Sequence, residues 1–327
     1  MSLRVGILGA AGIAPAAIIA PASRRGDVEI LAVASRSASG AAAYAERFGI
    51  PRSYGSYAEL VADDDIDLVY VALPPSSHAE WTIAALEAGR HVLCEKPSAM
   101  NATQARRMAD AAERTGRRFI EAFHDRYHPL TEHLLEVVGS GRLGAIRHIT
   151  GTFRASNPFD PESIRHDPAL GGGALMDLGC YPAHWLRSLG GEPRVVSAVA
   201  TLNPMGADLS MLAQLEFASG ATGTLDASMD DPTLTQRVEI VGERGSITAD
   251  GMLFPSKGHS VVEVIDGIRR VSTVAGQETY DHQLAAIVDA LASGAELPTE
   301  GADAVATMTL IDAVYAAAGF DREEYSA

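Results

Sequence analysis

Three ionisable side chains repeat at helical spacing near the middle of the chain. Asp177, Tyr181 and His184 occupy positions i, i+4 and i+7 of a segment that opens on three glycines at 171–173. Residues at this spacing share one face of an α-helix. That face would present a carboxylate, a phenol and an imidazole to one cleft, and these groups donate and accept protons. The alternative is a polar stripe with no chemical role.

A lysine follows another short apolar run, in the tripeptide Glu95-Lys96-Pro97. If the run is a strand, Lys96 lies at the carboxyl edge of a sheet. A lysine there can stay charged and favour an alkoxide over an alcohol, which helps a hydride to leave carbon. The alternative is a surface lysine paired with Glu95.

Small residues follow the first apolar run of the chain, at 3–8. A strand that turns sharply into a helix over small residues brings backbone N–H groups close to the pyrophosphate of a dinucleotide. The same pattern also fits a tight strand–helix turn without a ligand. The candidate cofactor-binding residues here are Gly9, Ala10, Gly12, Ile13 and Ala14.

The residues after the second apolar run bear on the choice of cofactor. Dinucleotide-binding folds that use NAD usually carry an Asp or Glu there, which binds the ribose 2′-hydroxyl. This chain has Ser35, Arg36 and Ser37 instead. An arginine and two hydroxyls suit a 2′-phosphate. The pattern therefore predicts NADP in preference to NAD, the alternative being a solvent-facing loop arginine.

The third apolar run ends in a loop that contains Leu73, Pro75 and His78. Open α/β sheets bind ligands at the carboxyl ends of their strands, so this loop is expected to line the nucleotide. His78 is a candidate cofactor contact. The alternative is a histidine that caps or packs against the following helix.

Residues 1–124 alternate short apolar runs with amphipathic helical segments, as in a doubly wound parallel sheet. This N-terminal region is predicted to be an NAD(P)-binding Rossmann domain. The expected strands are 3–8, 28–34, 68–73, 91–94 and 118–122, and the expected helices are 13–23, 38–48, 77–88 and 102–115.

Residues 125–327 change to period-two patterns, which predict a C-terminal α+β domain with a large, mostly antiparallel open sheet. Such a sheet with few covering helices needs another surface against its second face, so a homodimer or homotetramer is expected. The expected strands are 146–154, 211–217, 222–228 and 237–240, with a hairpin turn at 218–220, and the expected helices are 175–189, 280–292 and 301–318.

Composition excludes several classes of protein. The formal net charge of −16 disfavours nucleic acid and anionic membranes as partners. Two cysteines give neither a disulfide framework nor metal-ligand spacing and fit a reducing cytosol. The apolar stretches are too short or too broken to span a bilayer, and strand-forming residues begin at Leu3. We therefore expect a cytoplasmic protein without a bound metal.

These motifs, in this order and spacing, resemble the glucose–fructose oxidoreductase, inositol dehydrogenase and rhizopine-catabolism (Gfo/Idh/MocA) family along essentially the whole chain. The segments that carry the resemblance are the Gly9 loop, Glu95-Lys96-Pro97, 121–129, 163–165 and 171–184. The resemblance implies a nicotinamide-dependent enzyme that acts on sugars, polyols or similar alcohols. It also implies that Arg165 approaches the cofactor and that the C-terminal sheet mediates subunit contact.

Residue by residue, the resemblance implies that Lys96 hydrogen-bonds the reacting oxygen and that Asp177 is the acidic residue of the substrate cleft. Many members of the family have histidine at the position of Tyr181. This chain resembles instead the branch with tyrosine there, which includes glucose–fructose oxidoreductase, dimeric dihydrodiol dehydrogenase and some NADP-dependent xylose dehydrogenases. Tyr181 is therefore the predicted acid/base.

Two points stay open at the level of sequence. Asn157, Arg165, His184 and His282 are candidates for lining the substrate pocket, and His184 is a substrate contact, an alternative base or a packed histidine. A non-enzymatic cofactor-binding regulator and an NAD-dependent glycoside hydrolase are alternatives on the same fold.

Overall fold

The computed structural model describes residues 2–320, and the contacts between them divide the chain into two compact units. The first unit comprises the chain up to Phe123 together with Tyr280–Val305. The second comprises His124–Thr279 and the residues from Ala306 on. The chain therefore returns to its first unit after completing most of the second. The predicted domain boundary between residues 124 and 125 stays a prediction.

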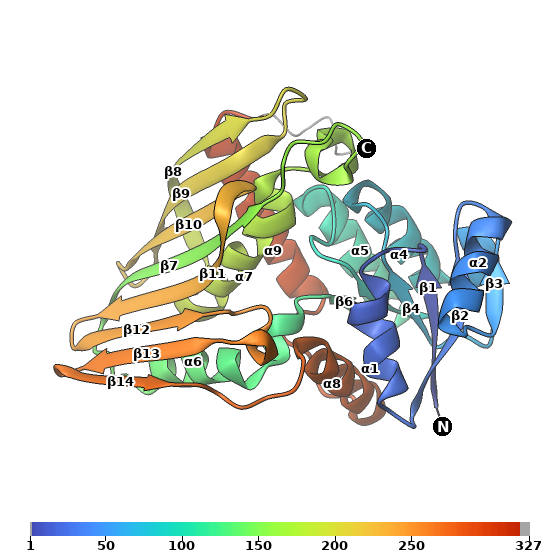
Figure 1. Ribbon diagram of the computed structural model, residues 1–327, viewed down its shortest axis with the longest axis horizontal. Coiled ribbons are helices and arrows are strands. Elements are labelled where there is room, and N and C mark those ends of the chain that lie inside the picture. Colours follow the sequence, from blue (N-terminus) through green and yellow to red (C-terminus); the bar gives the residue numbers. More distant parts are fainter. Residues whose placement is uncertain (1, 321–327) are drawn as a thin grey trace. The chain divides into compact units, whose positions relative to one another are not determined.

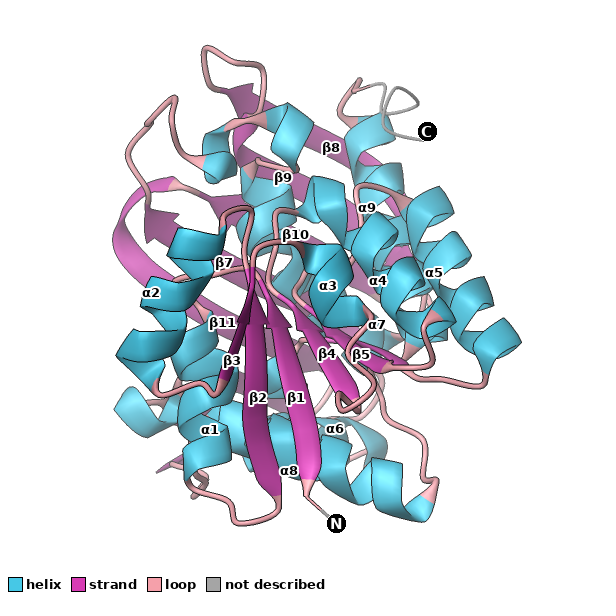
Figure 2. Cartoon of the chain, turned by 90° about the vertical axis from the view of Figure 1, so that its right-hand side faces the viewer, coloured by secondary structure: helices cyan, strands magenta, loops and turns pink. Residues whose placement is uncertain are grey.

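The first unit is built on a six-stranded parallel sheet in the order β3-β2-β1-β4-β5-β6. The order reverses between β1 and β4, which is where doubly wound sheets bind ligands. Figure 2 shows the first five of these strands side by side with helices around them. The strands are β1 (Leu3–Leu8), β2 (Val28–Ala34), β3 (Arg52–Tyr54), β4 (Leu68–Val71), β5 (His91–Cys94) and β6 (Phe119–Glu121).

Local capping residues fix the ends of two helices in this unit. Ser37 and Asn101 cap α2 and α5, because each side chain accepts a backbone N–H of the first turn. Gly49 and Gly116 end the same helices in the left-handed region. The helices are α1 (Ala20–Ser23), α2 (Ala38–Phe48), α3 (Tyr57–Val61), α4 (His78–Glu87), α5 (Ala102–Thr115) and α8 (Thr279–Ser293), whose first residue is grouped with the second unit.

The second unit contains an eight-stranded sheet in the order β14-β13-β12-β11-β7-β10-β9-β8 (Figure 1). Its strand pairs are antiparallel except for β7 and β10. The strands are β7 (Ile146–Ser156), β8 (Pro193–Leu202), β9 (Asp208–Phe217), β10 (Thr222–Ser228), β11 (Asp230–Gly242), β12 (Gly245–Asp250), β13 (Ser260–Ile265) and β14 (Ile268–Ser272).

Helices α6 (Pro129–Gly139) and α7 (Cys180–Gly190) cover one face of this sheet. Gly151 of β7 lets α7 approach closely, because a Cβ there would lie 3.1 Å from the Cβ of Pro182. On α6, the His133 Nε2 lies 3.0 Å from the Oε1 of Glu263 in β13. The last helix, α9 (Gly301–Ala317), is shared between the two units.

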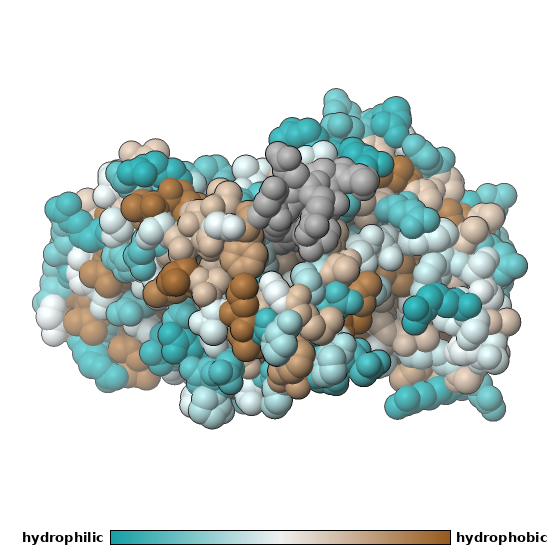
Figure 3. All heavy atoms as spheres, turned by 90° about the horizontal axis from the view of Figure 1, so that it is seen from above, coloured by the Kyte–Doolittle hydropathy of each residue, from teal (hydrophilic) through white to brown (hydrophobic). Residues whose placement is uncertain are grey.

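The other face of the sheet carries exposed apolar side chains. Val199 of β8 lies opposite Leu212 of β9, and these residues are 63% and 41% exposed. The neighbours of Leu212 along the strand, Met211 and Ala213, are buried, as strand alternation requires. Exposed apolar residues of this sheet also include Val196, Leu202, Leu234, Ile268 and Val271. Seen from above, hydrophobic residues also reach the molecular surface between polar ones (Figure 3).

The predicted fold class is confirmed: a parallel doubly wound sheet and a second, mostly antiparallel sheet are both present. The bounds of β1, β2, α2, β5 and α5 match the predictions, and the turn at 218–220 joins β9 to β10 as an antiparallel hairpin. The predictions missed β3, α3, α6, β8 and β12–β14. Of these, β3 and α3 are short, and β8 and β14 are largely solvent-exposed, so their hydrophobic periodicity is weak.

The predicted helices over 13–23 and 175–189 are present, but their first turns differ from an α-helix. Each begins with a π-helical turn, at Pro15–Ile19 and Leu175–Gly179, before the α-helix starts. In a π turn the backbone hydrogen bond joins residues i and i+5 instead of i and i+4. Residues four apart in the sequence therefore need not lie on the same face of the helix. Within the described residues, no helix is both long and apolar enough to cross a membrane.

Candidate active site

The loop after β1 has the backbone that the glycine pattern predicts. Gly9 has a φ of +105°, and a Cβ there would lie 2.5 Å from the carbonyl oxygen of Ala72. Only glycine fits such a position. Ala10, Gly12 and Ile13 are exposed, and Ala14 is buried at the beginning of the helix. The loop therefore offers accessible backbone without side-chain bulk, which fits the phosphates of a dinucleotide.

In the loop after β2, the two serines and the arginine have different surroundings. The Ser35 hydroxyl donates to the Ser37 carbonyl at 2.8 Å, and the Ser37 hydroxyl accepts the N–H of Gly40 at 3.2 Å. Both hydroxyls thus shape the turn into α2. Arg36 is exposed, and among residues 2–320 no carboxylate forms an ion pair with it. The guanidinium is the part of this loop that suits a 2′-phosphate.

A buried phenol fixes the loop that carries Lys96. The hydroxyl of Tyr70, fully buried in β4, donates to the Glu95 carboxylate at 2.5 Å. The other oxygen of Glu95 accepts the backbone N–H of Lys96 at 3.3 Å. Burial and the Glu95 charge both raise the pKa of Tyr70 well above its usual value, so this phenol remains a donor. Lys96 itself is half-buried and precedes Pro97 through a cis peptide bond.

His78 joins the two loops at this edge of the sheet. Its Nδ1 lies 3.0 Å from the carbonyl oxygen of Pro97, and its Nε2 lies 2.8 Å from that of Leu73. The side chain is fully buried, and desolvation lowers its pKa to about 4. This geometry supports the packing role that the sequence left open. Direct contact of His78, Leu73 or Pro75 with a cofactor stays a prediction.

In the second unit, the structure brings Arg165 and Asp177 together. The Arg165 Nε donates to the Asp177 Oδ2 at 2.9 Å, and the two side chains are 52% and 21% exposed. The glycine run makes this possible, because a Cβ on Gly172 would lie 2.7 Å from the backbone of Arg165. The pair therefore presents a fixed carboxylate beside an accessible guanidinium.

Tyr181 is 4% exposed, and its hydroxyl lies 3.1 Å from the Nε2 of His124. The Nδ1 of His124 lies 2.7 Å from the hydroxyl oxygen of Thr279. The Thr279 hydroxyl donates in turn to the carbonyl oxygen of Leu253 at 3.1 Å. Sequence reasoning missed His124 and Thr279, and no local pattern could have linked residues so distant along the chain.

His184, one helical turn beyond Tyr181, is 1% exposed and lies near a buried acid. The neighbouring Trp185 donates from its Nε1 to the Asp125 Oδ2 at 2.5 Å. Burial raises the pKa of Asp125, while the charge of His184 and the indole hydrogen bond oppose that shift. The predicted polar stripe therefore consists of a partly exposed Asp177 and two buried residues.

The two remaining substrate candidates fall in different units. Asn157 directly follows β7, is half-buried and donates its backbone N–H to the Met229 carbonyl at 2.8 Å. His282 lies on α8 in the first unit, and burial lowers its pKa. Their role in substrate binding stays a prediction.

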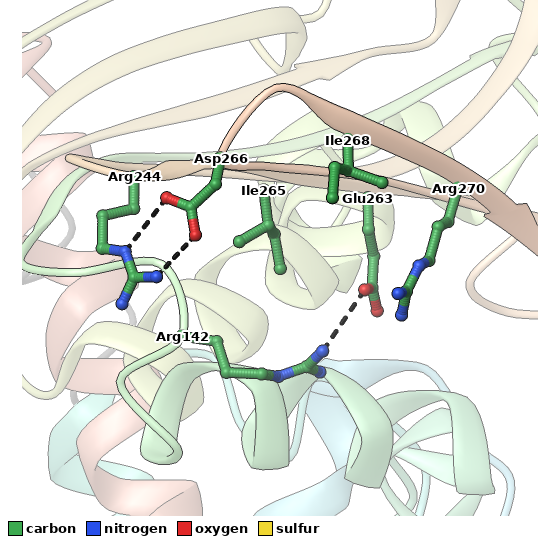
Figure 4. Close-up of a pocket in the computed structure, with 7 residues that line it drawn as sticks. All are labelled: Arg142, Arg244, Glu263, Ile265, Asp266, Ile268 and Arg270. Carbon is green, nitrogen blue, oxygen red and sulfur yellow. Dashed lines mark hydrogen bonds and ion pairs between the residues drawn. The ribbon is translucent and has the colours of Figure 1, made fainter.

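A hollow of about 290 Å³ under the β13–β14 hairpin is separate from these residues (Figure 4). Ion pairs between Arg142 and Glu263 and between Arg244 and Asp266 occupy its walls. None of the predicted site residues lines it. In the part of the chain that the structure describes, no group of three His, Cys, Asp or Glu side chains could hold a metal ion.

The chain belongs to the Gfo/Idh/MocA family. Residues 3–123 match the oxidoreductase family's NAD-binding Rossmann fold, and residues 131–248 match the GFO/IDH/MocA C-terminal domain. An uncharacterized oxidoreductase of Rhizobium meliloti is 39% identical over 95% of this chain and 96% of its own length. The protein is thus an NAD(P)-binding oxidoreductase.

Further relatives include a D-xylose 1-dehydrogenase (NADP(+)) of Haloferax volcanii, 37% identical over 96% of both chains. Among solved structures, a 3-ketoreductase from Actinomadura kijaniata in complex with NADP and TDP-benzene is 28% identical. It matches with a TM-score of 0.90 over 97% of this chain and 98% of that chain. An aldose-aldose oxidoreductase from Caulobacter crescentus is 27% identical, with a TM-score of 0.89 over the same shares.

Because the pKa of His78 is about 4 when folded and about 6.5 when unfolded, the unfolded state binds more protons between these values. The contribution of neutral His78 to the free energy of unfolding is therefore fully present above pH 6.5 and is lost as the pH falls toward 4. Lowering the pH from 7 to 5 should remove about 2 kcal/mol of unfolding free energy through this residue. In His78→Gln, urea unfolding should show that much less pH dependence. An unchanged pH dependence would contradict the assignment.

Proposed function

We propose that this protein is an NADP-dependent oxidoreductase that transfers a hydride between the nicotinamide and a hydroxyl or carbonyl group of a sugar, polyol or related alcohol. The observation that carries the proposal is the phenol of Tyr181, held in a buried hydrogen-bonded position on α7. The names of the xylose dehydrogenase, the aldose-aldose oxidoreductase and the 3-ketoreductase support a carbohydrate substrate.

In this proposal Tyr181 is the acid/base and Lys96 assists it at the reacting oxygen. A free phenol has a pKa of about 10, which is too high for efficient proton abstraction near neutrality. A nearby ammonium group stabilises the phenolate and lowers that pKa. When bound, the nicotinamide supplies or accepts the hydride. The phenol donates a proton to a carbonyl oxygen in reduction, and the phenolate accepts one from a hydroxyl in oxidation.

The other predicted residues take supporting roles. Asp177 holds Arg165 and shapes the substrate cleft, while Arg165 approaches the cofactor. Arg36 binds the 2′-phosphate, and the Gly9 loop binds the pyrophosphate. We assign the nucleotide's remaining contacts to Leu73, Pro75, His78 and Glu95, and the substrate's to Asn157, His184 and His282.

Charge reversal at Arg36 tests the cofactor assignment. In Arg36→Asp the affinity for NADP(H) should fall by about 2 kcal/mol, because a charge-assisted contact is replaced by repulsion. The affinity for NAD(H), which lacks the 2′-phosphate, should change much less. Fluorescence titration of both cofactors measures this, with Arg47→Asp on the following helix, α2, as the control. Equal wild-type affinities for NADP(H) and NAD(H) would refute the preference.

Removal of the Tyr181 hydroxyl tests the mechanism. Tyr181→Phe should keep its cofactor affinity and lose turnover by about 10²–10⁴-fold, the usual contribution of a general acid/base. Lys96→Met should also lose turnover and flatten its pH dependence. The two losses should be non-additive, because the residues act as one unit. Steady-state kinetics over a panel of aldoses, polyols and dicarbonyls with NADP(H) and NAD(H) provides the measurement.

His184→Asn serves as the contrast within the same helix. If its imidazole only positions substrate, the variant should raise KM more than it lowers kcat. The reverse ranking, with an inactive His184→Asn and a nearly wild-type Tyr181→Phe, would place the acid/base at His184.

We also propose that a second copy of the chain covers the exposed apolar face of the eight-stranded sheet. Val199 and Leu212 face each other across two adjacent strands there and are 63% and 41% exposed. Monomers rarely leave large contiguous apolar patches uncovered. A two-fold pairing of this face would bury the same residues on both copies.

Light scattering at micromolar concentration should give the mass of a dimer or tetramer. Val199→Asp and Leu212→Asp each place a charge in the apolar face and should shift the mass toward the monomer. Ala43→Asp, on the exposed surface of α2, should leave it unchanged. A monomeric wild-type protein would exclude this assembly.

A further inference from the structure

We propose that His124 is a positioning residue that orients the Tyr181 hydroxyl and takes up its proton during turnover. The inference rests on the proposed role of Tyr181 as the acid/base. It adds a residue that neither the sequence motifs nor the names of the relatives assign. The observation behind it is the hydrogen-bonded chain from Tyr181 through His124 and Thr279 to the Leu253 carbonyl.

The donor and acceptor of each hydrogen bond in this series follow from the Leu253 carbonyl at its end. A carbonyl oxygen only accepts, so the Thr279 hydroxyl donates its single proton to Leu253 at 3.1 Å. The Thr279 oxygen can then only accept from the His124 Nδ1 at 2.7 Å. A neutral imidazole with its proton on Nδ1 has a bare Nε2. The Tyr181 hydroxyl, 3.1 Å from that Nε2, is therefore the donor.

The surroundings hold the two rings in place and keep water away. Tyr181, His124 and Thr279 are 4%, 2% and 0% exposed. The His124 ring stacks on Phe254, with ring centroids 5.8 Å apart and planes 29° apart. The ring of Phe153 also lies 5.8 Å from that of Tyr181. These ring contacts limit the movement of both side chains.

Three further ionisable groups lie near the pair, namely Asp125, Arg126 and His184. Asp125 follows His124 and is fully buried, with its Oδ2 bonded to the Trp185 indole. His184 and Arg126 both act on the charge of Asp125. Asp125 and Arg126 follow His124 in the sequence, and His184 lies on α7. The group that contacts the His124 Nδ1 is the Thr279 hydroxyl.

The proton inventory of the proposed oxidation balances. A bound oxidised nicotinamide would accept the hydride from the substrate C–H bond. The substrate O–H proton passes to the Tyr181 oxygen, and the Tyr181 proton passes to the His124 Nε2. The substrate becomes a carbonyl compound, and His124 becomes an imidazolium that keeps its Nδ1 proton on Thr279. After product release, the Nε2 proton returns to Tyr181 as Tyr181 gives its own to solvent. Reduction runs the same transfers backwards.

His124→Gln separates hydrogen bonding from proton uptake, because the amide oxygen accepts a hydrogen bond but does not become protonated near neutrality. We expect kcat for oxidation to fall about tenfold to a hundredfold, with KM and the cofactor dissociation constant little changed. The kcat–pH profile should shift to higher pH, where solvent base can ionise the phenol. Thr279→Val, which removes the oxygen that fixes Nδ1, should cause a smaller loss in the same direction. His133→Gln, on α6, is the matched control.

The outcomes distinguish this inference from the proposed function. Turnover retained in Tyr181→Phe overturns the proposed acid/base and the inference with it. An inactive Tyr181→Phe beside a His124→Gln variant with wild-type kcat and pH profile overturns the inference alone. Nitrogen-15 NMR of the wild-type imidazole needs no folded variant. A neutral His124 with its proton on Nδ1 supports the inference, and a proton on Nε2 overturns it.

Discussion

The need of buried polar groups for hydrogen-bond partners is the constraint on which the candidate residues of each unit depend. An unmade hydrogen bond in the interior costs about 1–3 kcal/mol, so a buried donor and its acceptor fix each other's position. In the first unit the Tyr70 phenol holds Glu95, which in turn holds the backbone of Lys96. In the second unit His124 and Thr279 hold the Tyr181 phenol. The proposed acid/base and the proposed assisting lysine are thus held by polar networks whose outer members, Tyr70 and Thr279, are fully buried.

The same local device starts the helix of each half. A loop with a glycine of positive φ leads into a π-helical turn and then into an α-helix, at Pro15–Ile19 and again at Leu175–Gly179. The glycines allow close backbone approach, at Gly9 to Ala72 and at Gly172 to Arg165. Single π turns within α-helices are frequent at functional sites. Here they coincide with the candidate cofactor loop and with Asp177.

The division of labour between the units follows from their sheets. The parallel sheet is buried on both faces and gathers loops at its carboxyl edge, so it supplies the Gly9 loop, Arg36 and Lys96. The mostly antiparallel sheet has one face covered by α6 and α7 and one face with exposed valines and leucines. Its covered face supports Tyr181, and its other face carries the exposed apolar residues of the proposed assembly.

Features that depend on neighbouring residues along the chain could be predicted from the sequence. Apolar runs and caps placed β1, β2, β5, α2 and α5, because hydrophobic period and capping are local properties. Gly9 was predictable because a tight strand–helix turn needs it. The short or solvent-facing elements β3, β8 and β14 were missed, since little of their pattern depends on burial.

Contacts between residues that are distant along the chain depend on the tertiary structure. His124 and Thr279 are far from Tyr181 in the chain, and no period or motif relates them. The pairing of Arg165 with Asp177 likewise required the fold of the glycine loop. The sequence also did not predict that Tyr280–Val305 would belong to the first unit. Local patterns report which residues are buried, whereas hydrogen-bond partners across the fold are selected by packing, which brings together side chains that the sequence keeps apart.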